Sequence, residues 1–388
     1  MKKSLGIPAT IFLIALFLTG HLICQDSRLT HAGNLRVLVL EGEPYQRGCE
    51  HGKALKKEIH ELLKLWKADI ERSYKVDADT FVKKFLNKTN FQESIMRWTP
   101  DLWEELKGIA DGADVELNTM YAFQLIDEMW VIGRDVQANN CTTIGVKKTK
   151  SSSIVAQNLD IPRFYHGFQT LQHIKNPKTD WEAFVFTIPG LIGANGLNNH
   201  SIAVVVNAIQ QLDHSFDGLP VAFVIRGILQ RKTYDDAVKF IRTVKHGAPQ
   251  NYMIGGSENV GSFECSTTHV SPFVPFKGAH FTYHTNHPLA NHAYTDRFLE
   301  YIKSQNKTPR NYVHECHRFR ALQNMLKDNS IKIDVSLLKG IFSDRETVIN
   351  NRGTYGCTIM VLKDNPELHI SPGRPDEEPF LTFKFNRN

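Results

Sequence analysis

A cysteine at the start of a strand-like run is the residue of this chain best suited to covalent chemistry. Cys141 begins the run CTTIGV, and Asp160 ends the run QNLD after a Lys/Ser-rich turn. A cysteine attacks an amide only when a nearby base takes its proton, and the α-amine of the same residue can be that base. This chemistry requires the chain to be cut between Asn140 and Cys141.

Four polar residues fall at the ends of predicted strands, where a sheet edge can project them into one cleft: Cys141, Asp160, Asn207 and Asn286. An α-amine with a pKa near ~8 suits a general base at neutral pH. Asp160 could orient this amine, and an asparagine N–H could stabilise an oxyanion. Taken singly, each residue also has an ordinary interpretation as a disulfide or core cysteine or as a turn former.

The N-terminus has the pattern of an export signal. Lys2 and Lys3 precede an apolar run from Leu5 to Leu18, which is shorter than the about 20 residues of a membrane-spanning helix. We therefore expect residues 1–24 to be a secretory signal peptide, with an uncleaved anchor as the alternative. The protein would then be exported, to a periplasm or outside the cell.

The chain has six cysteines, and Cys24 would leave with the signal. Apart from Cys141, the mature chain would keep four: Cys49, Cys265, Cys316 and Cys357. These could form zero, one or two disulfides in an oxidising compartment.

Residues 25–140 show mainly helical patterns. From Glu50 to Ile70 the apolar residues recur at three- and four-residue steps, which is typical of an amphipathic helix. Further helices are predicted over 79–91, 100–110 and 118–132.

After residue 140 the period of the pattern changes to two. Strands are predicted over 153–160, 183–188, 202–207, 252–254, 262–266 and 280–285, with helices over 220–230, 234–244, 291–304 and 313–326. A closing hairpin is predicted to pair 358–362 with 381–385. Strand blocks that alternate with paired helices indicate an α+β fold, a four-layer α/β/β/α sandwich preceded by a helical N-terminal segment.

Charge and histidine patterns exclude two other classes of function. The net charge is only +5 over 388 residues, and the lysines are scattered on helical faces, so we expect no nucleic-acid partner. A histidine cluster suggests a metal site: His280, His284, His287 and His292. However, His280 and His284 lie on one predicted strand about 13 Å apart, too far for one zinc ion with ligands near ~2 Å. We therefore expect no metal and no cofactor.

The order of five motifs resembles the autoproteolytic acyltransferases related to acyl-coenzyme A:6-aminopenicillanic acid acyltransferase, in the N-terminal-nucleophile (Ntn) hydrolase superfamily. The motifs are GEPYQRG at 42–48, CTT at 141–143, QNLD at 157–160, HTNH at 284–287 and GRP at 373–375. The segment 196–208 is similar to a hairpin that the bile-salt hydrolases share. The resemblance spans nearly the whole mature chain and implies a sandwich of the Ntn-hydrolase type.

The resemblance also implies roles for single residues. Cys141 would act first on the carbonyl of Asn140, which splits the chain, and then on the substrate. The remaining expected roles are processing for Thr142 and Thr143, orientation of the amine for Asp160, and oxyanion donation for Asn286 and Asn207.

Two positions depart from the fungal acyltransferase pattern. Asn140 stands where that enzyme has a glycine, and Tyr355 stands where it has an arginine, with Arg352 three residues upstream as a substitute. We expect Tyr355 and Arg352 to contact the substrate. Without a fixed cation, the site should prefer substrates whose amine portion is neutral or cationic over carboxylates.

The sequence therefore predicts an exported, self-cleaving cysteine amidohydrolase or acyltransferase that acts on the C–N amide bond of a small N-acylated amine or amino acid. Residues 25–140 would be released or retained as a small subunit, packed with the catalytic chain 141–388 as one domain. The alternatives are a bile-salt-like or lipid-amide hydrolase, and a catalytically silent secreted binding protein with the same fold.

Overall fold

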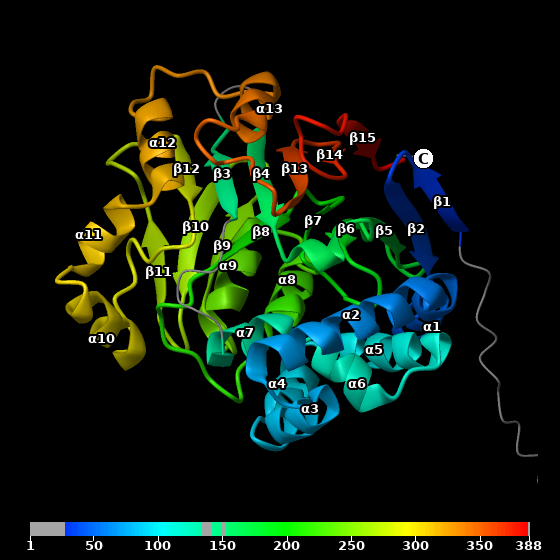
Figure 1. The fold of residues 1–388 in the computed structure, drawn as a ribbon. Coiled ribbons are helices and arrows are strands. Elements are labelled where there is room, and N and C mark those ends of the chain that lie inside the picture. The colour runs from blue at the N-terminus through cyan, green and yellow to red at the C-terminus, as the bar shows by residue number, and fades with distance from the viewer. Residues whose placement is uncertain (1–27, 134–140, 149–151, 387–388) are drawn as a thin grey trace, which may run out of the picture.

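The structure is a computed structural model that describes residues 28–133, 141–148 and 152–386. Two β-sheets are stacked face to face, and helices cover their outer faces (Figure 1). The predicted α+β class and four-layer α/β/β/α sandwich are thereby confirmed.

The larger sheet has nine strands within the described ranges, in the order β1-β2-β5-β6-β7-β8-β9-β10-β11. Neighbouring strands are antiparallel except β2 and β5, which are parallel. The strands are β1 (Arg28–Ala32), β2 (Leu35–Glu41), β5 (Thr170–Lys175), β6 (Glu182–Thr187), β7 (Asn195–Asn198), β8 (Ala203–Ala208), β9 (Gln250–Gly255), β10 (Val260–Cys265) and β11 (Val270–Phe273). The N-terminal strands β1 and β2 were not predicted. Both precede Cys141 in the sequence and form one end of this sheet.

The smaller sheet carries the strands around Cys141, in the order β12-β3-β4-β13-β14-β15. The strands are β12 (Phe281–His284), β3 (Thr142–Val146), β4 (Ser153–Asp160), β13 (Thr354–Leu362), β14 (Glu367–Ser371) and β15 (Leu381–Lys384). The predicted closing hairpin is wrong, because β14 lies between β13 and β15. The turn before β14 contains Asp364, Asn365 and Pro366, a typical turn sequence that the strand pattern alone did not use.

Seven helices of the described N-terminal segment pack beside the larger sheet. They are α1 (Pro44–Ala54), α2 (Lys56–Tyr74), α3 (Ala78–Asn87), α4 (Phe91–Trp98), α5 (Pro100–Ala113), α6 (Leu117–Phe123) and α7 (Ile126–Gly133). The helix predicted over 118–132 is divided into α6 and α7. Between them the Gln124 side chain donates to Gly190 O and accepts from Ile192 N, which is a long-range contact that a local pattern does not reveal.

Helices α1 and α5 cross at very short range. A Cβ added to Gly48 would lie 1.9 Å from the backbone oxygen of Glu105, and one added to Gly108 would lie 2.1 Å from that of Tyr45. Real side chains cannot approach so closely, so glycine is required at both positions. The glycine at the end of the GEPYQRG motif therefore has a packing role.

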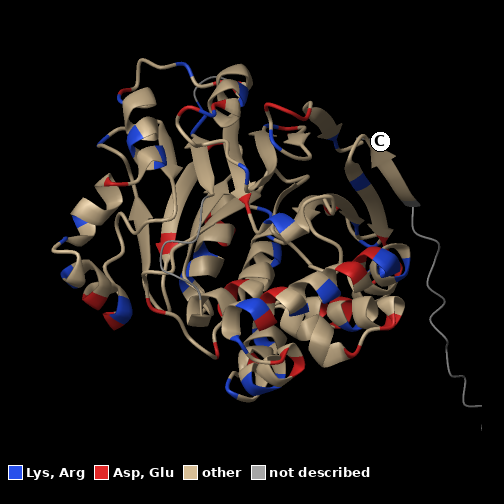
Figure 2. Ribbon diagram, in the orientation of Figure 1, with Lys and Arg blue, Asp and Glu red and all other residues tan. Residues whose placement is uncertain are grey.

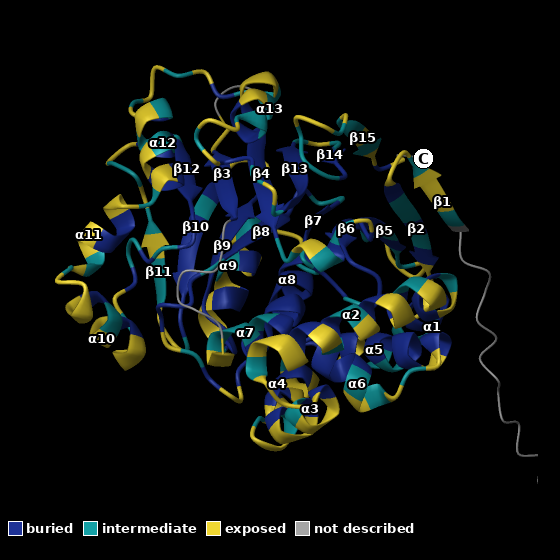
Figure 3. Ribbon diagram, in the orientation of Figure 1, coloured by how far each residue is buried: buried dark blue, intermediate teal, exposed yellow. Residues whose placement is uncertain are grey.

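The remaining helices are α8 (Val221–Leu229), α9 (Tyr234–Thr243), α10 (Asp296–Ser304), α11 (Pro309–His314), α12 (His317–Met325) and α13 (Val335–Ser343). Helix α8 packs on β7 and β8, α9 packs on β9, and α13 packs on β4 and β13. Both sheets are largely buried, while the exposed residues lie on the outer sides of the helices (Figure 3). Lys and Arg are interspersed with Asp and Glu over these outer helices (Figure 2). None of the helices in the described part of the chain has the length and apolarity that a bilayer crossing requires.

Candidate active site

Cys141 lies directly before β3 and is buried, with 7% of its surface exposed. Strands β3 and β4 pair as an antiparallel hairpin, with Thr142 opposite Asn158. This register returns the chain so that the backbone N of Asp160 lies 3.4 Å from the Cys141 Sγ and donates to it. The predicted proximity of Cys141 and Asp160 follows from this hairpin.

The Asp160 carboxylate is held from one side. Its Oδ2 accepts from the side chain of Asn351, whereas its Oδ1 is buried and has no hydrogen-bond partner among the described residues. Burial raises the pKa of Asp160 to about 7, although Arg318, Thr354 and Asn351 oppose the shift. One carboxylate oxygen is therefore available beside Cys141 for another donor.

The thiol of Cys141 is protonated at neutral pH in the uncleaved chain. Burial and the Asp160 carboxylate raise its pKa to about 12, despite the opposing effects of the Asp160 N–H and of Arg318. Because a thiolate is the reactive form, this cysteine needs a base before it can attack a carbonyl.

Arg318, on α12, is a site residue that the sequence did not single out. Its Nη1 donates to Cys141 O at 2.5 Å and to Thr142 Oγ1 at 3.0 Å, and its Nη2 donates to Asn286 Oδ1 at 3.2 Å. Arg318 is buried. A charged residue four positions before the buried Leu322, on the same helix face, was the one signal that could have identified it.

Asn286 lies in the same pocket as Cys141 and Asp160. Its Nδ2 donates to Ala208 O at 3.1 Å, and its Oδ1 accepts from Arg318. The orientation of the side chain is therefore fixed by Ala208 and Arg318, and its Nδ2 carries a second N–H besides the one that Ala208 O accepts.

Asn207 is not among the residues that line this pocket. Its neighbours Val206 and Ala208 do so, and alternation along a strand turns Asn207 the other way. Its Oδ1 accepts from Thr143 Oγ1 at 2.8 Å and from Asn251 Nδ2 at 3.1 Å. Its buried Nδ2 has no partner within the described ranges, so the donor that the prediction requires is present but lies outside the pocket.

The residues that the sequence predicts to act in processing occupy different positions. Thr142 accepts from Arg318, and Thr143 bridges to Asn207. Asn140 lies outside the described residues.

Tyr355 and Arg352 are separated in the structure. Tyr355 lies at an irregularity in the β4–β13 pairing, between Thr354 and Gly356, and such a bulge can redirect a side chain. It lines the pocket, and its hydroxyl donates to Thr187 O at 2.9 Å. Arg352 is exposed and does not line the pocket.

The pocket is mainly apolar. Its apolar lining includes Ile126, Trp130, Leu159, Leu191, Val221 and Ile225. Two carboxylates, Asp127 and Asp160, also line it, and the described lining residues include no Lys, Arg or His. The side chain of Gln250 donates to Asp127 at 2.9 Å.

The other cysteines and the histidines do not add to this site. Cys265, Cys316 and Cys357 are free thiols. In the part of the chain that is described, no three His, Cys, Asp or Glu side chains are grouped as they would be to hold a metal ion.

Several solved structures are similar to this one. An N-acylethanolamine-hydrolyzing acid amidase ortholog of Caenorhabditis elegans has 17% identity and a TM-score of 0.41, and covers 63% of this chain and 100% of its own. A mutant conjugated bile acid hydrolase of Clostridium perfringens has 11% identity and a TM-score of 0.39, and the match covers 63% of this chain and 97% of the hydrolase. Penicillin V acylase of Agrobacterium tumefaciens has 10% identity and a TM-score of 0.35, and the match covers 60% of this chain and 82% of the acylase.

Sequence comparison gives a family assignment. No curated protein matches the chain. A family model described as acyl-coenzyme A:6-aminopenicillanic acid acyl-transferase matches residues 147–353, more than half of the 388 residues. The match begins after Cys141 and includes Asp160, Asn286 and Arg318. The chain therefore belongs to the acyl-coenzyme A:6-aminopenicillanic acid acyl-transferase family.

Proposed function

We propose that this protein is an exported cysteine amidohydrolase that activates itself by cleavage before Cys141 and then hydrolyses a small N-acyl amide. The observation that carries the proposal is the buried Cys141 Sγ beside an Asp160 carboxylate whose Oδ1 has no partner among the described residues. Export is inferred from the apolar run Leu5 to Leu18.

Self-cleavage would create the base that the thiol needs. The Cys141 Sγ attacks the carbonyl carbon of Asn140 and forms a thioester. The thiol proton passes by way of the adjacent Asp160 carboxylate to the peptide nitrogen, which leaves as the α-amine of Cys141. Water then hydrolyses the thioester and restores the thiol. The new amine would lie beside Asp160, and the vacant Oδ1 could accept one of its N–H groups.

Turnover would use the same groups again. The amine takes the thiol proton, Sγ attacks the amide carbonyl of the substrate, and the leaving amine receives that proton. Asn286 Nδ2 is the donor for the developing oxyanion, since Arg318 fixes its orientation in the pocket. Water hydrolyses the acyl-enzyme; an acceptor amine would give acyl transfer instead.

The lining of the pocket supports a class of substrate. An apolar wall that includes Trp130, Leu191 and Ile225 suits an apolar acyl group. Carboxylates at Asp127 and Asp160, with no Lys or Arg among the described lining residues, disfavour an anionic amine portion.

The packing supports retention of the N-terminal segment as a subunit. Strand β2 pairs with β5, and Glu105 on α5 forms buried ion pairs with Arg226 on α8. Release would expose the edge of β5 and leave Arg226 buried without its carboxylate, at a cost of about 3–5 kcal/mol.

The proposal is tested with two matched sets of N-acyl amides. The first set varies the acyl chain at a fixed neutral amine, and the second adds a carboxylate to the amine at a fixed acyl chain. We expect hydrolysis that favours apolar acyl groups and disfavours carboxylates by at least tenfold, with no turnover by Cys141→Ala.

The alternatives give different results. Preference for bile-acid conjugates with acidic amines would favour the bile-salt-like hydrolase and contradict the predicted charge preference. A chain that remains intact and hydrolyses none of the amides would support the silent binding protein.

A further inference from the structure

We propose that Glu264 and His284 form a buried clamp that positions Asn286 for the reaction at Cys141. Glu264 lies on β10 and His284 ends β12, and the loop 285–291 follows directly. Neither residue lines the pocket, so both would be positioning residues. The kinetic part of this inference rests on the proposed amidase function.

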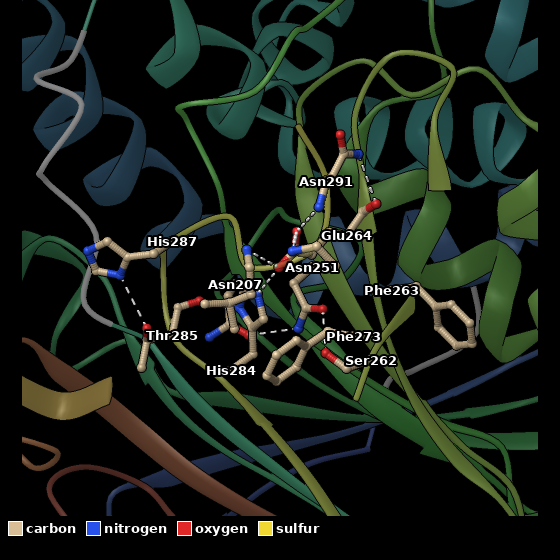
Figure 4. A network of polar contacts seen from close by, with 12 residues as sticks. Asn207, Asn251, Ser262, Phe263, Glu264, Phe273, His284, Thr285, His287 and Asn291 are labelled. Carbon is tan, nitrogen blue, oxygen red and sulfur yellow. Dashed lines mark hydrogen bonds and ion pairs between the residues drawn. The ribbon is translucent and has the colours of Figure 1, made fainter. Parts of the chain in front are cut away.

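Glu264 holds the far end of the loop through its carboxylate (Figure 4). Its Oε1 accepts from Leu289 N at 2.6 Å, and its Oε2 accepts from Ala290 N at 2.9 Å and from Asn291 N at 2.7 Å. Three consecutive backbone donors on one carboxylate fix both the position and the direction of this segment. Charge-assisted bonds of this kind are stronger than neutral ones.

His284 holds the near end of the loop. Its Nε2 lies 2.8 Å from Glu264 Oε1, and its Nδ1 contacts Thr285 O. The carboxylate oxygen and the carbonyl oxygen are both acceptors, so a ring that carries a proton on each nitrogen would satisfy both contacts. Both side chains of the pair are fully buried.

Asn286 lies between these two fixed ends. From there a line of contacts reaches the cysteine, because Arg318 bonds both Asn286 Oδ1 and Cys141 O. In the β12–β3 pairing, His284 also lies opposite Thr143. The clamp thus connects to the catalytic cysteine through the loop and through the sheet.

The other ionisable groups around Glu264 and His284 do not take over the charge of either residue. Burial, Arg318 and His284 lower the pKa of His287 to about 3, so His287 is neutral, and its Nδ1 contacts Thr285 Oγ1 at 3.2 Å. Cys265 and Tyr294 lie near Glu264, and their pKa values are raised, first by burial and then by its charge. Glu264 and His284 therefore compensate each other.

Burial of an ion pair costs desolvation, and a well-packed apolar pair is often at least as stable. Stability alone is thus a weak reason for a charged pair here. The three backbone donors of residues 289–291 supply another reason, since an apolar side chain could not satisfy them. The geometry fits a role in placing the loop.

The test compares Glu264→Gln with Glu105→Gln. Both changes remove the charge of a buried, ion-paired carboxylate, but Glu105 contacts neither the pocket nor the loop. In Glu264→Gln the new NH2 group must face a donor, so the loop should shift. We expect kcat to fall about 10- to 100-fold with KM within threefold, whereas Glu105→Gln should keep kcat within twofold.

Two further readouts need no substrate. Hydrogen exchange of amides 289–291 should accelerate at least tenfold in Glu264→Gln and remain unchanged in Glu105→Gln. The rate at which iodoacetamide labels Cys141 should change only in Glu264→Gln. These results would separate a failed clamp from a failed amidase assignment.

Glu264→Asp is the second test variant, to be used if Glu264→Gln does not fold. It keeps the charge but withdraws the carboxylate by one methylene, so the clamp predicts faster exchange at 289–291 and a lower kcat. Wild-type exchange in Glu264→Asp, or equal kcat losses in Glu264→Gln and Glu105→Gln, would overturn the proposal.

Discussion

Glu105 and Glu264 are equally buried carboxylates that bind very different donors. Glu105 is bound by side chains on other elements, with Arg226 at 2.7 Å and Arg47 at 3.0 Å. Glu264 is bound by one histidine and by three backbone N–H groups of a loop. The first carboxylate joins packed helices, whereas the second sets the course of a chain segment that carries Asn286.

The difference indicates where stability and activity should separate. Although burial raises it, Arg226 and Arg47 hold the pKa of Glu105 at about 2, so this carboxylate stays charged at any physiological pH. This carboxylate connects α5 to both α1 and α8. In the sequence, α1 and α5 precede the proposed cleavage site, whereas α8 follows it. We therefore expect changes at Glu105 to act on stability and changes near Asn286 to act on turnover.

The largest effect is expected for Glu105→Ala. The change leaves Arg226 and Arg47 buried without their carboxylate, which should lower the free energy of unfolding by about 3–5 kcal/mol. Denaturant unfolding measures this loss. A loss below about 1 kcal/mol would mean that water or rearrangement compensates the two arginines, and the contrast with Glu264 would fail.

Asn286→Ala should produce a catalytic effect of nearly the same size. Removal of an oxyanion donor costs about 2–4 kcal/mol of transition-state stabilisation, with little change in unfolding. Steady-state kinetics on purified, cleaved protein test this. Wild-type kcat would reduce Asn286 to a residue that binds Ala208 and Arg318 only.

Glu128 extends the comparison to a carboxylate that is only partly satisfied. Its Oε1 accepts from Val221 N, its Oε2 has no partner among the described residues, and burial together with Asp127 raises its pKa to about 8. Because the pKa is raised, its contribution to stability is present below pH ~4.5 and is lost as the pH rises through 8.

Glu128→Gln should therefore match the wild type at pH 4 and exceed its unfolding free energy at pH 9 by about 2–4 kcal/mol. Thermal or denaturant unfolding across this range measures the difference. A constant difference at all pH values would show that Glu128 does not titrate in the folded protein.

The smallest effect is expected for Tyr355→Phe. The change removes one neutral hydrogen bond to Thr187 O, at a cost of about 1 kcal/mol. If the hydroxyl also contacts the leaving amine, KM should rise while kcat stays near the wild-type value. An unchanged KM would limit Tyr355 to packing and to the bond with Thr187.

The sequence predicted those features whose signals are local. The spacing of Cys141 and Asp160 around a turn indicated the hairpin that brings them together, and period-two runs indicated β4, β6 and β8. Glu264 and Arg318 were missed because their partners lie far away in the sequence. A strand glutamate does not reveal from its neighbours that it will be buried against a loop, and for Arg318 the only local signal was its position on the same helix face as Leu322.

Asn207 illustrates the opposite case. Its position at a strand end was predicted correctly, yet its side chain turns away from the pocket toward Thr143, because alternation along β8 assigns the pocket face to Val206 and Ala208. Strand position follows from a pattern, whereas the face that meets a pocket depends on how the two sheets stack.

The claim that Cys141 becomes an N-terminal nucleophile is tested most directly by intact-mass measurement and N-terminal sequencing of the purified protein. We predict a chain that begins at Cys141, together with a retained N-terminal subunit, and a single uncleaved chain for Cys141→Ala. A different new N-terminus, or an uncleaved wild-type chain that hydrolyses amides, would contradict the claim.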